Sequence, residues 1–187
     1  MEPIEIIEIL GVATALAYLV LVTKRRWIAW PFYIASSCFY VPVFWAANLY
    51  ADAALQLYFV AMGVYGWIAW RGEAEAVAVV STPIQRNLSI AAVIVGASAV
   101  VGYALSYTRA GWFGYSDAFI SIGSVVATYL TARKVLEGWY YWIVIDIVAA
   151  IVFSLRELDV TVWLYLIYVL LAVRALLIWR AVFRSQE

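Results

Sequence analysis

Residues 51–70 read ADAALQLYFVAMGVYGWIAW and contain one charged side chain, that of Asp52. A helix rises about 1.5 Å per residue, so a run of this length covers the hydrocarbon core of a bilayer, which is roughly 30 Å thick. The apolar residues form a continuous run and do not alternate with polar ones, as a strand of a membrane barrel would require. Arg71 ends the run. The stretch therefore predicts a transmembrane helix.

Comparable apolar stretches occur along the whole chain, so the sequence predicts an all-α integral membrane protein that crosses the bilayer seven times. Apolar residues make up 67% of the 187 residues and charged residues 13%, against roughly 45–50% and 25% in soluble domains. One small globule cannot bury that much apolar surface, and we expect lipid to cover part of it. The predicted helices are Ile4–Thr23, Trp27–Ala47, Ala51–Trp70, Asn87–Tyr107, Ser116–Ala132, Trp139–Phe153 and Val160–Trp179.

The residue types that the chain lacks narrow its chemistry. It has no histidine and one cysteine, Cys38, and its formal net charge is zero. We therefore expect no metal, no cofactor, no catalytic residue and no nucleic-acid partner. A membrane-embedded enzyme that uses Asp117 and Asp146 is the remaining catalytic alternative, although no nucleophile motif accompanies them. A retinal photoreceptor would need a lysine in the last helix, and the two lysines, Lys24 and Lys134, lie elsewhere.

Part of the sequence is repeated. The stretch Trp27–Trp30 follows a basic cluster, as Trp139–Trp142 does, and the third and seventh predicted helices both end in Trp-Arg. Residues 4–70 and 116–180 are predicted to form two three-helix units of equal orientation. A linker and connector helix at 71–107 joins them within a single transmembrane domain, 1–187. This is a parallel 3+1+3 repeat. The alternative is that W-x-x-W pairs recur because tryptophan favours the headgroup region.

The third predicted helix carries a polar and aromatic stripe. Gln56, Gly63, Trp67 and Trp70 fall close together at helical spacing, and Phe59 lies nearby. A glutamine inside an apolar span needs a hydrogen-bonding partner. That partner is either a neighbouring helix or a bound substrate.

The sixth predicted helix carries a carboxylate in its interior. Trp139, Trp142 and Asp146 are spaced i, i+3, i+7 and therefore share a face. A carboxylate at this depth costs roughly 2.5–3.5 kcal/mol on insertion scales, and such residues are functional by default. Asp146 therefore faces a polar cavity or a distant partner, or it is protonated. We interpret it as a functional residue, with a structural hydrogen bond as the alternative.

The fifth predicted helix carries a third polar stripe. Asp117, Ser121, Ser124 and Thr128 step by four, three and four residues along one helical face. A stripe of this kind lines a pathway, or it holds helices together through small residues. Asp117, at the outer end, is expected to contact solvent.

Residues 56–70 resemble the PnuC family of vitamin transporters, whose third core helix carries a pattern similar to Q-x-x-[YF]-x5-Y-G-W-x-x-W. Residues 49–52, 132–146 and the region of Asp117 are also similar to that family. The resemblance implies uptake of nicotinamide riboside by facilitated diffusion with cytosolic trapping. It also implies a 3+1+3 fold related to the SWEET proteins, and a homotrimer. Some members that take up nicotinamide riboside have asparagine where this chain has Asp146, and related members carry thiamine or riboflavin.

The tryptophans and the carboxylate of the predicted site suit a cationic aromatic substrate. Nicotinamide riboside carries a pyridinium and thiamine a thiazolium, and the faces of tryptophans attract cations by about 0.5–2 kcal/mol per contact. These considerations do not choose between the two vitamins. The predicted substrate-binding residues are Gln56, Phe59, Trp67, Asp117, Ser121, Trp139, Trp142 and Asp146.

The distribution of basic residues predicts the orientation in the inner or plasma membrane. If the helices alternate in direction, one side collects only Arg109 and Arg156, and basic residues favour the cytoplasm. The other side collects Lys24, Arg25, Arg26, Arg71, Arg86, Arg133, Lys134, Arg180 and Arg184. The N-terminus is thus expected outside and the C-terminus in the cytoplasm. A reporter fused to the C-terminus should be active only in the cytoplasm; activity confined to the outside would contradict this topology.

Overall fold

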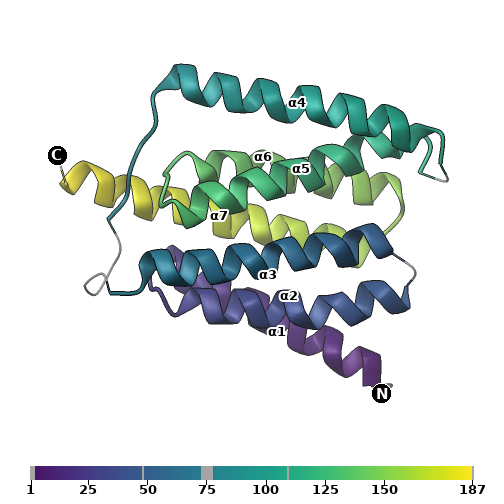
Figure 1. Cartoon of the computed structure of the whole chain (residues 1–187), viewed down its shortest axis with the longest axis horizontal. Helices are drawn as coiled ribbons and strands as arrows, with labels where there is room; N and C mark the ends of the chain where they lie inside the picture. Colours follow the sequence, from purple (N-terminus) through teal and green to yellow (C-terminus); the bar gives the residue numbers. More distant parts are fainter. Residues whose placement is uncertain (1–2, 48, 73–77, 109, 187) are drawn as a thin grey trace. The chain divides into compact units, whose positions relative to one another are not determined.

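The structure is a computed structural model that describes residues 3–47, 49–72, 78–108 and 110–186, and this part of the chain forms seven helices (Figure 1). Each predicted apolar stretch lies on one helix. Arg109 falls outside the described residues. The helices are α1 (Pro3–Thr23), α2 (Ala29–Ala46), α3 (Tyr50–Trp70), α4 (Ile84–Ser106), α5 (Phe113–Ala132), α6 (Gly138–Leu155) and α7 (Asp159–Ser185).

Most helix boundaries differ from the prediction, and two of the differences have a clear cause in the chain. α2 begins at Ala29, because Arg25 adopts a left-handed φ of 56° and the next residues form a turn. Trp27 therefore precedes the helix. α7 continues beyond Trp179 to Ser185, since no glycine or proline interrupts the chain there.

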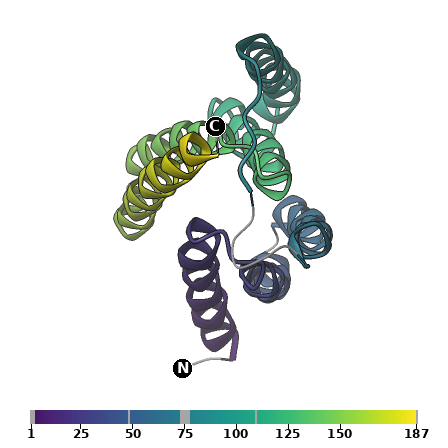
Figure 2. The same cartoon turned by 90° about the vertical axis from the view of Figure 1, so that its left-hand side faces the viewer.

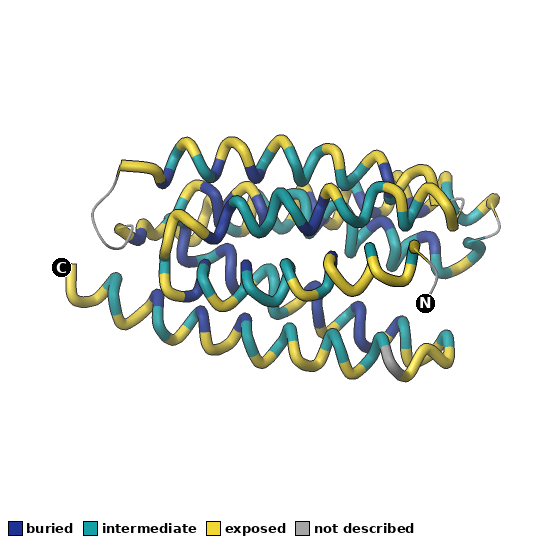
Figure 3. Tube along the Cα trace, turned by 90° about the horizontal axis from the view of Figure 1, so that it is seen from below, coloured by how far each residue is buried: buried dark blue, intermediate teal, exposed yellow. Residues whose placement is uncertain are grey.

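Five helices are long and apolar enough to cross a membrane: α1, α3, α4, α6 and residues 161–185 of α7. Within the described chain, α2 and α5 fall below the same hydropathy because they contain many aromatic and small polar residues. Protein buries only a minor part of the most apolar stretch of each helix, from 17% in α4 to 39% in α6. Figure 3 shows exposed residues recurring along the helices, which is the pattern expected where lipid is the solvent.

The described chain divides into two compact units by its contacts. The first comprises residues 1–78 with 132–134, and the second comprises 79–131 with 135–187. In the first unit α2 packs against both α1 and α3, and in the second α6 packs against α7 (Figures 1 and 2).

Close packing on α2 organises the first unit. The Trp30 side chain is fully buried, and its indole meets the Trp70 ring edge-on at a centroid distance of 5.3 Å. The same indole lies directly on Gly66, where a Cβ atom would overlap its ring. On the other side, the Ser36 hydroxyl donates a 2.9 Å hydrogen bond to the Gly11 carbonyl of α1. Small residues thus let the three helices approach closely.

Glycines also set the spacing of helices in the second unit. A Cβ atom at Gly102 of α4 would lie 2.6 Å from the Tyr115 backbone of α5. A Cβ atom at Gly123 of α5 would lie 2.9 Å from the Ile145 side chain of α6. α4 therefore packs on α5, and α5 packs on α6.

The segment before α4 is fixed to the start of α6. The Leu136 amide donates to the Val80 carbonyl at 2.9 Å. The Glu137 carboxylate accepts hydrogen bonds from the Ser81 hydroxyl at 2.5 Å and from the Thr82 amide at 3.0 Å. Charged acceptors make such bonds stronger than neutral ones. Glu137 thereby holds the incoming chain of α4 against α6.

Corresponding features of the two halves lie 109 positions apart. α2 and α6 both have 18 residues, and they begin at Ala29 and Gly138. Arg25 and Lys134 both have a left-handed φ, 56° and 65°. Before these helices, Arg26 N donates to Leu21 O, as Val135 N does to Leu130 O. After them, Leu49 N donates to Phe44 O, as Leu158 N does to Phe153 O.

The tryptophans follow the same offset. Trp30 meets Trp70 edge-on, and Trp139 meets Trp179 edge-on at 5.4 Å. The structure therefore matches Trp139 with Trp30, whereas the W-x-x-W pattern had suggested Trp27. By this register the counterpart of Trp142 is Tyr33, and the counterpart of Asp146 is Ser37.

The contact between Gly66 and Trp30 predicts different effects for two glycine substitutions. Gly66→Ala should destabilise the protein by about 1–3 kcal/mol, because overpacking must displace the buried indole. Gly96→Ala is the matched control, since a Cβ atom there meets nothing within 4 Å. It should be neutral or stabilising by up to roughly 1 kcal/mol, the helix-propensity gain of alanine. Thermal unfolding in detergent measures both; equal midpoints for the two variants would contradict the packing.

Candidate functional site

The predicted residues of α3 lie in the first unit. Gln56 is half-buried and makes no hydrogen bond with any residue that the structure describes. Phe59 is half-buried and contacts the Tyr33 ring at a centroid distance of 6.1 Å. The Trp67 indole N–H is buried without an acceptor among the described residues. These three side chains thus keep hydrogen-bonding or aromatic capacity that the folded chain does not use.

Trp70 and Gly63, which share the predicted stripe, have a different role. Trp70 is fully buried, and its indole N–H donates a 3.0 Å hydrogen bond to the Ala132 carbonyl. A Cβ atom at Gly63 would meet the Ile34 side chain of α2. The stripe is therefore divided into a packing part and a part that is available for binding.

Tyr33 is a residue of the first unit that sequence reasoning missed. Its ring contacts those of Tyr18 at 4.6 Å, Trp30 at 5.7 Å and Phe59 at 6.1 Å. An aromatic cluster thus leads from the core to Phe59. The signal in the sequence was the position of Tyr33, which lies 109 residues before Trp142.

Asp146 of α6 is the most unusual polar residue of the second unit. It is 5% exposed and lies in the interior of an 18-residue apolar helix. It makes no hydrogen bond or ion pair with the residues that the structure describes. A buried carboxylate without a partner is costly, so Asp146 does not stabilise the fold through any contact that the described residues make.

The two tryptophans that share a face with Asp146 are held differently. Trp139 is 2% exposed, packs on Trp179, and has no acceptor for its indole N–H among the described residues. Trp142 is half-buried, and its indole N–H donates a 3.2 Å hydrogen bond to the Thr131 hydroxyl of α5. The Thr131 hydroxyl in turn donates to the Ala127 carbonyl at 2.9 Å. Trp139 thus belongs to the core, while Trp142 is a fixed and accessible aromatic surface.

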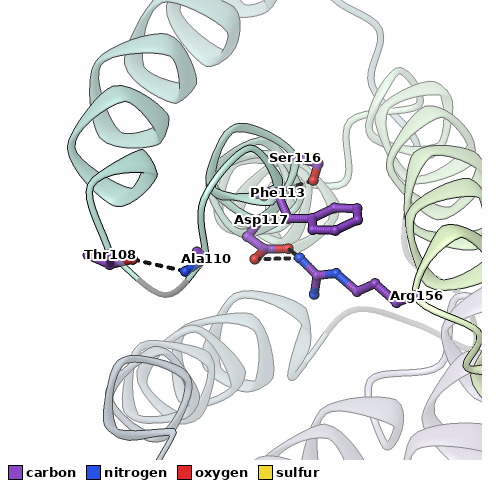
Figure 4. A network of polar contacts seen from close by, with 6 residues as sticks. All are labelled: Thr108, Ala110, Phe113, Ser116, Asp117 and Arg156. Carbon is purple, nitrogen blue, oxygen red and sulfur yellow. Dashed lines mark hydrogen bonds and ion pairs between the residues drawn. The ribbon is translucent and has the colours of Figure 1, made fainter.

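Asp117 of α5 forms an ion pair that the sequence did not predict. Its two carboxylate oxygens accept hydrogen bonds from one guanidinium nitrogen of Arg156 at 2.7 and 2.8 Å (Figure 4). The guanidinium also lies over the Phe113 ring, 4.5 Å from its centroid. Both side chains remain partly exposed, at 36% and 27%. Asp117 therefore contacts solvent, as expected, but its charge is already compensated.

Ser121 lies one turn further along α5. It is half-buried and makes no hydrogen bond within the described chain. It therefore remains available to a ligand, unlike Asp117.

A separate apolar cavity of about 230 Å³ lies between α4, α5 and α6. It contains none of the predicted site residues. Its only polar side chain is Tyr141, whose hydroxyl donates to the Asn87 carbonyl at 2.9 Å. A polar vitamin would find no partners in this cavity. The lining residues are Ala91, Ile94, Val95, Phe119, Gly123, Tyr141, Val144 and Ile145.

A family of known proteins matches most of this sequence. The family described as nicotinamide mononucleotide transporter matches residues 5–181. The chain belongs to that family. It is accordingly a multi-pass membrane transporter, as the resemblance of its third helix implies.

Proteins similar to this chain are named for different vitamins. The riboflavin/roseoflavin transporter RibM of Streptomyces davaonensis is 32% identical to this chain, over 75% of the chain and 68% of RibM. The nicotinamide riboside transporter PnuC of Escherichia coli is 26% identical, over 73% of this chain and 69% of that protein. A crystal structure of the vitamin B3 transporter PnuC matches with a TM-score of 0.78 at 20% identity, over 97% of this chain and 83% of that one. This last match shows that the fold is shared.

The ion pair predicts the behaviour of Asp117→Asn and Arg156→Gln. If Asp117 serves only the pair, both variants should lose the same small stability, and the double variant should lose no more than either. Partly exposed pairs contribute about 0.2–1 kcal/mol, which a double-mutant cycle of thermal unfolding measures. Substrate affinity should be the same in all three variants. A loss of affinity in Asp117→Asn but not in Arg156→Gln would instead assign the carboxylate to substrate binding.

Proposed function

We propose that the protein takes up nicotinamide riboside by facilitated diffusion, with cytosolic phosphorylation trapping the product. The transporter family supports the general activity, and the PnuC of Escherichia coli is named for this substrate. The observation that carries the choice of substrate is Asp146, a buried carboxylate that has no cation among the described residues. Nicotinamide riboside supplies the missing positive charge through its pyridinium ring.

The residues around Asp146 suit a flat cationic ring. Trp142 is half-buried, and the Thr131 hydroxyl fixes its indole, so an aromatic face is preorganised one turn from the carboxylate. A cation over such a face gains about 0.5–2 kcal/mol. Trp139 is closed in by Trp179 and acts as a positioning residue for this helix face. Ser121 offers a hydroxyl without an internal partner.

In the first unit, Gln56 and Trp67 offer the polar groups that a ribose needs. The Gln56 amide has no hydrogen bond, and the Trp67 N–H has no acceptor, among the described residues. Buried donors without acceptors are uncommon in folded proteins and suggest a ligand. Phe59 adds an aromatic surface. The proposed substrate contacts are given for each unit by itself: Gln56, Phe59 and Trp67 in the first, and Ser121, Trp142 and Asp146 in the second. In the second unit Trp139 positions the helix face, and Asp117 serves the ion pair with Arg156.

The proposal includes the organisation of the protein in the inner membrane. Seven spans are proposed, with the N-terminus outside and the C-terminus in the cytoplasm, in a single domain. The constant offset of 109 positions supports a parallel 3+1+3 repeat, with residues 4–70 and 116–180 as its halves. The resemblance to the PnuC family is the basis for a homotrimer. No enzymatic activity is proposed.

A second candidate substrate is riboflavin. The relative with the higher identity, 32%, is named for riboflavin and roseoflavin. The isoalloxazine ring of riboflavin is neutral at pH 7, however, and would leave the charge of Asp146 uncompensated. Thiamine, which is cationic, satisfies the same chemistry as nicotinamide riboside and is the alternative within the family.

Purified protein in proteoliposomes tests the proposed transport. Labelled nicotinamide riboside should equilibrate across the membrane without any ion gradient, and thiamine and riboflavin should be taken up more slowly. Accumulation above equilibrium that a protonophore abolishes would contradict facilitated diffusion. Preferential uptake of riboflavin or thiamine would change the assigned vitamin but not the mechanism.

Two substitutions of Asp146 test the role of its charge. Asp146→Asn should weaken binding of nicotinamide riboside several-fold to about tenfold, because a charged hydrogen bond is stronger than a neutral one by about 0.5–1.5 kcal/mol. Asp146→Leu should lose more, since the hydrogen bond is also removed. Ser37→Ala, at the corresponding position of the first half, is the matched control. Calorimetric affinities and yields measure these effects, and wild-type affinity in well-folded Asp146→Leu protein would remove Asp146 from the site.

A further inference from the structure

Arg174 is a cation in the interior of the last helix. It lies in α7, within the part of that helix, residues 161–185, that is long and apolar enough to cross a membrane. Trp179 follows five residues later, about 7.5 Å further along the helix axis. Trp179 is fully buried against Trp139, so the helix is still packed in the core beyond Arg174. The Arg174 side chain itself is exposed.

No protein group compensates this charge in the part of the chain that the structure describes. Arg174 makes no ion pair, hydrogen bond or ring contact there. Arg156, which follows the end of α6, is by contrast paired with Asp117. A guanidinium in contact with hydrocarbon is costly, and membrane proteins compensate it with an anionic partner or by extending it to the headgroups.

The corresponding position in the first half shows what is special about Arg174. Its counterpart 109 residues earlier is Tyr65, a neutral side chain whose hydroxyl lies 3.5 Å from the Arg133 guanidinium. The first half thus has a neutral tyrosine at this point of the helix. The second half has a cation at the same point of an equivalent helix. Both positions lie inside their helices, so the two halves differ here in the side chain.

Arg174 lies on a continuous exposed stripe of α7. The stripe is defined by residues spaced four, three, four and three apart, which is one helical face. Its apolar members are 46–70% exposed. The members are Trp163, Ile167, Leu170, Arg174 and Leu177. Three apolar residues precede the single cation along this stripe. A phospholipid has the same order of features, an apolar acyl chain followed by a charged headgroup.

We propose that the α7 stripe binds an anionic phospholipid, with its phosphate at Arg174 and its acyl chain along Leu170, Ile167 and Trp163. In the orientation proposed above, the phosphate comes from the cytoplasmic leaflet, where Arg180 and Arg184 of the same helix are also exposed. Helical side chains leave the backbone towards the N-terminus, so Arg174 starts out directed away from that surface. Arg174 therefore does not reach the general layer of headgroups, and its partner is a single lipid whose phosphate lies deeper, next to the guanidinium.

Titration of the purified protein with phosphatidylglycerol, followed by native mass spectrometry, tests this site. Arg174→Gln should raise the apparent dissociation constant for phosphatidylglycerol about fivefold, since one arginine near an anionic membrane surface contributes roughly 1 kcal/mol. Arg174→Lys should stay within about twofold of the wild type, because it keeps the charge. Arg184→Gln is the matched control on the same helix, about 15 Å further on towards the headgroups, and should raise the dissociation constant less than Arg174→Gln does.

Three results would overturn the proposal. Equal affinities in Arg174→Gln and the wild type would remove Arg174 from the lipid site. Competition by inorganic phosphate as effective as that of added phosphatidylglycerol would show a free-anion site without an acyl-chain contact. A loss of oligomer mass in Arg174→Gln at unchanged lipid affinity would assign the stripe to a second copy of the chain. None of these measurements depends on which vitamin is carried.

Discussion

Close approach of helices at small residues is the constraint on which this fold depends. Lipid is as apolar as the side chains it replaces, so helices in a bilayer associate through packing and hydrogen bonds. The Trp30 indole can lie flat on α3 only because position 66 has no side chain. Trp139 meets Trp179 in the same way, and Ala175, the counterpart of Gly66, is fully buried. Each half is thus organised by one buried tryptophan and one small residue.

The polar side chains divide into those that the fold uses and those that it leaves free. The first group holds helices or loops together and consists of Ser36, Trp70, Glu137 and the Asp117–Arg156 pair. The Asp146 carboxylate and the Trp67 indole N–H have no such role among the described residues. In hydrocarbon, a polar group without a hydrogen bond destabilises the folded protein. The proposed substrate contacts rest on Asp146 and Trp67, although the buried indole N–H groups of Trp30 and Trp139 also have no acceptor among the described residues.

The sequence predicted the helices well, because a bilayer permits few alternatives to a continuous apolar run. The 3+1+3 repeat stays a prediction. Its register could not be read from the sequence, since a W-x-x-W pair does not reveal which tryptophan enters the core. The partner of Asp117 could not be foreseen, because Arg156 is 39 residues away in the chain. Arg174 was overlooked for a related reason: one cation within a long apolar run hardly changes its hydropathy. Asp146 was recognised because its own neighbours in sequence offer no compensation.

The equal lengths of α2 and α6 restrict how the protein can change. Inserting one residue in α2 but not in α6 would rotate all later side chains of that helix by about 100° and move them out of step with their counterparts. Trp30 would keep its place while Ser36 and Ser37 turned away from their present surroundings. Replacement of a side chain carries no such penalty, as the different residues at positions 37 and 146 illustrate. Exchange of single residues, rather than changes in helix length, is therefore the route by which this scaffold could acquire a new cargo.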